Sequence, residues 1–128
     1  MHKVLIPTKL DKFAAQMLAD KGYTVVADAA TPLTDLCKAH PDTDVLIVRS
    51  ENITPEIIDL LPKLNLVVRA GAGYNTIDIK YARKRNVDVM NTPGANSNAV
   101  AEEVVAMMMV VAHRLIATVG VHHIEHAE

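Results

Sequence analysis

Five short aliphatic runs alternate with five helical patterns along this 128-residue chain. The runs are β-branched or almost continuously apolar, which is typical of strands that are covered on both faces. We expect strands over Lys3–Pro7, Thr24–Ala27, Val45–Arg49, Leu66–Ala70 and Val87–Asn91. Short right-handed connections then require one parallel sheet between two layers of helices. The pattern predicts a flavodoxin-like three-layer α/β/α fold with strand order 2-1-3-4-5.

The helix boundaries carry their own signals. The helical patterns begin near Leu10, Thr31, Thr54, Thr76 and Ser97. Thr31 and Thr54 each precede a proline, a pairing typical of an N-cap residue and the first helical position. Gly22 fits a stop after the first helix. No linker or repeat is visible, so we expect a single domain over residues 1–128, with the last helix over residues 97–124.

Composition narrows the class of protein. Half of the residues are hydrophobic but only 3% are aromatic, so the core must be aliphatic. A net charge of −2 without a basic stripe argues against a nucleic-acid partner. The apolar stretch Val104–Ala112 is too short to span a membrane, and the N-terminus lacks a signal-peptide pattern, so we expect a cytoplasmic protein. The single cysteine, Cys37, excludes an intramolecular disulfide and falls at an inward helix position.

The loops at the carboxyl ends of the strands are where such sheets bind ligands. Gly71-Ala72-Gly73 follows the fourth strand, where glycine lets a ligand approach the backbone and its N–H groups. We expect a cradle for a carboxylate or phosphate; the alternative is a turn that needs glycine for its own conformation. The run also nearly matches the dinucleotide fingerprint, but Thr76 replaces the third glycine and Asn91, not an acid, ends the next strand.

Two arginines end neighbouring strands of the predicted sheet. Arg49 closes the third strand, Arg69 lies near the end of the fourth, and Ser50 follows Arg49. A guanidinium can bind a carboxylate or phosphate through two parallel hydrogen bonds. Either arginine alone fits a solvated strand end, but the pair beside the glycine loop favours an anion site. Asn96 can direct its amide toward the same ligand.

Other chemistries fit less well. A phosphoacceptor receiver domain needs acids after the first strand and an Asp ending the third, where this chain has Thr8-Lys9 and Arg49. A flavodoxin needs a glycine-containing phosphate loop and aromatic side chains. His122 and His126 have the i, i+4 spacing of helical metal ligands, but a polar helix end explains them more simply, and we expect no metal site.

The chain resembles the D-2-hydroxyacid dehydrogenases, and within them most closely the D-3-phosphoglycerate dehydrogenases. The resemblance rests on three segments: VLIVRSENITPEII (45–58), LVVRAGAGYNTIDI (66–79) and VMNTPGANSNAVAEEVVAMM (89–108). Members of this family of NAD-dependent oxidoreductases have a discontinuous substrate-binding domain and a Rossmann domain, and the D-3-phosphoglycerate dehydrogenases among them serve serine biosynthesis. The resemblance covers residues 3–112, which correspond to the substrate-binding domain and its hinge helix.

The resemblance also implies roles for individual residues. The backbone amides of Gly71, Ala72 and Gly73 would hold the substrate carboxylate. Arg49 and Arg69 would hold the phosphate end with Ser50 close by, and Asn96 would contact substrate from the hinge loop. The catalytic Arg, Glu and His of the family lie on the nucleotide domain and match nothing here, so we expect no catalytic residue and no cofactor in this chain, although the parent family uses NAD.

Three hypotheses about function follow. The chain is a substrate-binding domain that binds a phosphorylated 2-hydroxy acid weakly without catalysis; or a structural or engineered fragment with no ligand; or a subunit whose nucleotide half comes from another chain. The last helix has an apolar face that either folds back on its own sheet or crosses to a second chain, giving a monomer or a domain-swapped homodimer. That face comprises Val100, Val104, Met107, Met108 and Val111.

Overall fold

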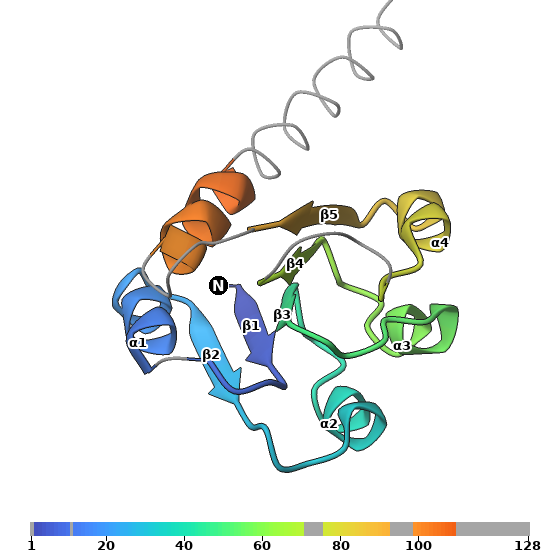
Figure 1. Cartoon of the computed structure of the whole chain (residues 1–128), viewed down its shortest axis with the longest axis horizontal. Coiled ribbons are helices and arrows are strands. Elements are labelled where there is room, and N and C mark those ends of the chain that lie inside the picture. The colour runs from blue at the N-terminus through green and yellow to red at the C-terminus, as the bar shows by residue number, and fades with distance from the viewer. Residues whose placement is uncertain (1, 11, 71–75, 93–98, 110–128) are drawn as a thin grey trace, which may run out of the picture.

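A computed structural model of the chain describes residues 2–10, 12–70, 76–92 and 99–109. Its strands form one parallel sheet in the order β2-β1-β3-β4-β5 (Figure 1). The predicted strand order is therefore confirmed, and the strand ends differ from prediction by one residue at most. The strands are β1 (Lys3–Ile6), β2 (Thr24–Ala27), β3 (Val45–Val48), β4 (Leu66–Arg69) and β5 (Asp88–Asn91).

Helices cover both faces of the sheet. Figure 1 shows α2, α3 and α4 along one side, and α1 with the helix over residues 99–109 along the other. The predicted last helix is thus seen over residues 99–109, and the remainder of 97–124 lies outside the described residues. The labelled helices are α1 (Lys12–Asp20), α2 (Leu33–Ala39), α3 (Pro55–Asp59) and α4 (Ile79–Lys84).

The predicted N-cap at Thr31 and the predicted helix start at Thr76 are wrong, and a nearby aspartate explains each. The Thr31 hydroxyl donates to Asp28 Oδ2 at 2.6 Å instead of capping α2, which begins at Leu33. The Asp28 carboxylate also accepts two backbone hydrogen bonds, from the N–H groups of Ala30 and Thr31. These three hydrogen bonds favour its charged form and lower its pKa, and the Thr31 hydroxyl is the largest cause. Helix α4 begins after Asp78, not at Thr76, because the Asp78 carboxylate accepts from the N–H of Tyr81 at 3.0 Å.

The signals at Leu10, Gly22 and Thr54 are confirmed, whereas the predicted start at Ser97 lies outside the described residues. The Thr54 hydroxyl accepts from the N–H of Ile57 at 3.4 Å, and Pro55 is the first residue of α3. Helix α1 begins at Lys12, close to the predicted Leu10, and ends before Gly22, which has a φ of +95°. This left-handed conformation is open to glycine at no steric cost, and it turns the chain directly into β2.

Side chains alternate between two apolar layers along the strands, so β3 is buried at every residue. The layer under α2, α3 and α4 receives these strand residues: Leu5, Leu46, Val48 and Val67. The layer under α1 and residues 99–109 receives these: Val4, Ile6, Val45, Ile47, Leu66 and Val68.

The described part of the last helix folds back on its own sheet. Val100, Val104 and Met108 are at most 2% exposed and pack in the second layer, while Met107 is partly buried there. Val111 lies outside the described residues. The packing follows the first of the two expected arrangements, and the oligomeric state stays a prediction. No helix within the described ranges has both the length and the apolar character needed to cross a bilayer.

Adjacent methionines provide a test of this packing. Met108 is 2% exposed and Met109 is 68% exposed. We expect Met108→Ala to lower the free energy of unfolding by about 2–5 kcal/mol, because it leaves a cavity in the core. Met109→Ala should change it by less than about 0.5 kcal/mol. Urea denaturation at two protein concentrations measures both effects; a midpoint that rises with concentration would show that a second chain holds the helix.

The buried thiol of α2 predicts a pH dependence. Cys37 is fully buried as expected, and burial raises the pKa of its thiol to about 11. In the unfolded chain the thiol titrates near its ordinary pKa of about 8.5. Its stabilising contribution is therefore complete below that value and is lost as the pH rises toward 11, by about 3–4 kcal/mol in all. The free energy of unfolding should fall less between pH 8 and pH 10.5 in Cys37→Ala than in the unchanged chain. An equal fall in both would show that the Cys37 thiol does not cause the pH dependence.

Candidate functional site

The β3–β4 register brings two arginines to one edge of the sheet. Val48 pairs with Arg69, and the N–H of Ala70 donates to the carbonyl of Val48 at 2.8 Å. Arg49 directly follows β3, so it lies beside the end of β4. Since all strands are parallel, this is the carboxyl edge, where ligands of open α/β sheets bind.

Backbone carbonyls hold the two arginine side chains in place. Arg69 Nε donates to the carbonyl of Arg49 at 3.0 Å, and Arg49 Nη1 reaches the carbonyl of Lys9 at 3.4 Å. The N–H of Arg49 donates to Glu51 Oε1 at 2.8 Å. These bonds tie together the ends of β1, β3 and β4, so the guanidinium positions depend on the sheet itself.

A hollow of about 250 Å³ opens between these strand ends, and we call it the anion hollow. It is lined by Thr8, Arg49, Ser50, Arg69 and Ala70. Arg49 and Ser50 are exposed, whereas the other three lining residues are partly buried.

The structure therefore brings together three of the seven predicted substrate-binding residues: Arg49, Ser50 and Arg69. The other four, Gly71, Ala72, Gly73 and Asn96, lie outside the described residues. The ligand role of all seven stays a prediction.

The lining is rich in hydrogen-bond donors. The lining residues of the anion hollow include two arginines and two hydroxyl-bearing residues, Thr8 and Ser50, and its volume is below the roughly 300 Å³ at which drug-sized pockets begin. Within the described part of the chain, this lining includes no carboxylate and no imidazole. The arrangement suits a small anion with several oxygen atoms.

Thr8 is a lining residue that the sequence reasoning did not assign. Its loop was expected at the ligand-binding edge, but no role was given to its side chain. The available signal was topological: in the order 2-1-3-4-5, β1 neighbours β3, so the residue just after β1 must lie near Arg49.

Comparison with known proteins identifies the family. The model of the D-isomer specific 2-hydroxyacid dehydrogenase catalytic domain matches residues 4–121. The chain belongs to this family. The resemblance expected from the three sequence segments is thereby confirmed.

Two similar proteins are each much longer than the region that they share with this chain. A hydroxypyruvate reductase from Thermotoga maritima is 35% identical over 115 residues, which cover 89% of this chain and 38% of that protein. D-3-phosphoglycerate dehydrogenase from Rattus norvegicus is 35% identical over 116 residues, covering 90% of this chain but 22% of that enzyme.

A solved structure shows the same relation. The NAD⁺-bound 3-phosphoglycerate dehydrogenase of Entamoeba histolytica superposes with a TM-score of 0.65 and 36% identity, covering 84% of this chain and 38% of the other. The chain thus spans at most 38% of each of these three relatives.

NAD does not fit the residues that the structure describes. A dinucleotide cradle requires glycines between a strand and a helix N-terminus, with an acid after the next strand to hold the ribose. Here Thr8 and Lys9 follow β1. Asp28 does follow β2, but its two carboxylate oxygens already accept from the N–H groups of Ala30 and Thr31 and the Thr31 hydroxyl.

A metal site is likewise not found among residues 2–10, 12–70, 76–92 and 99–109, where no three His, Cys, Asp or Glu side chains cluster. His122 and His126 lie outside those ranges.

Proposed function

We propose that this chain is a substrate-binding part of a D-2-hydroxyacid dehydrogenase that binds a phosphorylated 2-hydroxy acid of the 3-phosphoglycerate type, weakly and without catalysis of its own. The observation that carries the proposal is the anion hollow, with Arg49 and Arg69 on adjacent strand ends. Its position at the carboxyl edge is where this class of sheet binds ligands.

Charge selects the phosphate end for this hollow. A phosphoryl group carries about two negative charges and three acceptor oxygens, which matches two guanidinium groups and two hydroxyls. Two of the relatives above are named for 3-phosphoglycerate, and the third is named for hydroxypyruvate, which has no phosphate. The arginine pair therefore supports the phosphorylated substrate.

Exposure keeps the affinity low. Arg49 and Ser50 are open to solvent, so salt and water screen their attraction for the anion. The resemblance assigns the substrate carboxylate to the amides of residues 71–73 at the same edge. A ligand held at both ends would lie across the carboxyl ends of β3 and β4.

Hydride transfer needs chemical groups that the anion hollow does not supply. Oxidising a hydroxyl requires a base for its proton and a nicotinamide to accept the hydride. The described lining contains neither a carboxylate nor an imidazole, and the described residues do not fit NAD. We therefore expect turnover only if another polypeptide segment supplies these groups.

A titration followed by amide NMR tests the proposal. 3-Phosphoglycerate should give saturable shifts at Arg49, Ser50 and Arg69, and also at the glycine loop and Asn96. Arg69→Ala should weaken binding about tenfold or more, because charge-assisted hydrogen bonds are lost. Arg69→Lys should recover only part of it, because lysine keeps the charge without the planar fork. Arg83→Ala, which changes an exposed arginine of α4, is the matched control.

Each outcome separates the hypotheses. Unchanged binding in Arg69→Ala would exclude the anion hollow as the site. A well-dispersed spectrum without saturable shifts would favour the fragment with no ligand. NADH formation by the chain alone would overturn the expected lack of catalysis, whereas NADH formation only after a nucleotide-binding partner is added would support the two-chain hypothesis. Glycerate, which lacks the phosphate, should bind more weakly than 3-phosphoglycerate.

A further inference from the structure

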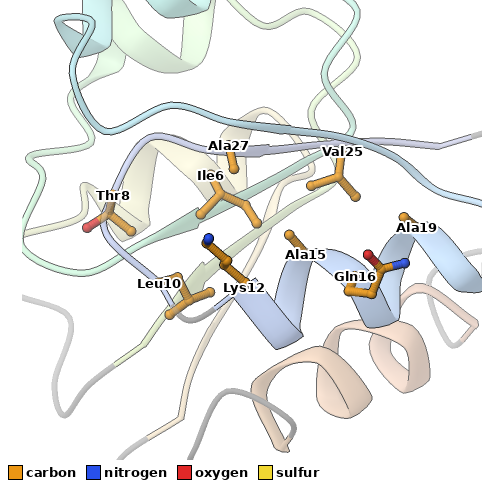
Figure 2. Close-up of a pocket in the computed structure, with 9 residues that line it drawn as sticks. All are labelled: Ile6, Thr8, Leu10, Lys12, Ala15, Gln16, Ala19, Val25 and Ala27. Carbon is orange, nitrogen blue, oxygen red and sulfur yellow. The ribbon is translucent and has the colours of Figure 1, made fainter.

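A second hollow lies between α1 and the strands β1 and β2, and we call it the α1 groove. Its volume is about 380 Å³, within the range of small-molecule pockets. Figure 2 shows Ile6 and Val25 extending from the strands toward α1, where Ala15 and Ala19 face them. Most of this surface is hydrocarbon.

The groove exists because small side chains meet at the edge of the sheet. Strand β2 has a neighbour on one side only, and Val25 is partly buried rather than buried. The alanines of α1 are too short to fill the space above it, so the close packing seen elsewhere in the core stops here. An apolar surface left open in this way gains free energy when a hydrocarbon group covers it.

One exposed cation, Lys12, lines this hydrocarbon surface. Figure 2 shows Lys12 extending from the start of α1 toward the strands, with its ammonium group turned to the Ile6 side of the groove. No ion pair in the described part of the chain involves Lys12. The nearby amide of Gln16 already donates to Asp20 Oδ1 at 2.9 Å, while Thr8 lines one end of the groove with its hydroxyl turned away from Lys12 (Figure 2).

We infer that the α1 groove binds an aliphatic monocarboxylate. The carboxylate pairs with the Lys12 ammonium, and the hydrocarbon chain covers Ile6, Val25 and the α1 alanines. Charge complementarity decides the class of ligand: an uncharged hydrocarbon would strip water from the ammonium without replacing its hydrogen bonds. A carboxylate replaces them with a charge-assisted pair.

This site is separate from the anion hollow, although Thr8 lines both. The α1 groove takes its charge from Lys12 and its shape from β2, neither of which lines the anion hollow. The two proposals can therefore fail independently.

Sodium octanoate is the probe for the test, added to the full chain and followed by amide NMR. We expect saturable shifts at β1, β2 and α1, and binding about tenfold or more weaker for octan-1-ol, which has the same chain without the charge. Lys12→Met, which keeps the length of the side chain, should weaken octanoate binding to a similar extent. Lys21→Met, at an exposed lysine after the end of α1, should not.

A second variant tests the shape of the groove. Ala19 is exposed, so Ala19→Leu is compatible with folding and should block octanoate by occupying the groove. Ala39→Leu, at an exposed alanine of α2, is the control. Both Lys12→Met and Ala19→Leu should leave 3-phosphoglycerate binding unchanged.

Three results would overturn the inference. The first is octanoate binding in Lys12→Met and in Ala19→Leu that is as tight as in the unchanged chain. The second is equal affinity for octanoate and octan-1-ol, which would mean that charge plays no part. The third is a set of shifts centred on the exposed Phe13 and Met109 side chains, or a concentration-dependent occupation of the groove by a second copy of the chain.

Discussion

Burial of the central strands on both faces is the constraint from which the rest of the structure follows. Every residue of β3 is inaccessible to solvent, so each face of the sheet needs its own layer of helices. Helices α2, α3 and α4 form one layer, and α1 and the helix over residues 99–109 form the other (Figure 1). The helix over residues 99–109 completes that second layer with Val100, Val104 and Met108. The sheet therefore needs this helix to cover the apolar side chains on that face.

The backbone determines where the arginine side chains of the anion hollow lie. Arg49 and Arg69 are held at neighbouring strand ends, although like charges repel, because the main-chain carbonyls of Lys9 and Arg49 accept their hydrogen bonds. These carbonyls lie in the segments that follow β1 and β3, which pair with each other, as β3 does with β4. A substitution that shifted a strand register would therefore move the site, even if it touched none of the lining residues.

Sequence patterns predicted the sheet well because aliphatic runs and parallel crossovers allow few alternatives. They predicted that Arg49 and Arg69 converge, since strand order and strand ends determine this. They misplaced the starts of α2 and α4 because side-chain hydrogen bonds to Asp28 and Asp78 compete locally with the expected caps. The α1 groove was beyond sequence reasoning, because it depends on how far alanines hold one helix from the sheet edge.

The second apolar layer also has a consequence for how the chain acquires its fold. It joins Val4 near the beginning of the chain to Met108 in the last described helix. During synthesis, β1, β3 and β4 leave the ribosome long before the helix that covers them. Contacts so distant in sequence form slowly, and hydrophobic strands that wait for them are prone to associate with one another. This layer therefore closes only after almost the entire described chain has been made, and a nascent chain would need protection until then.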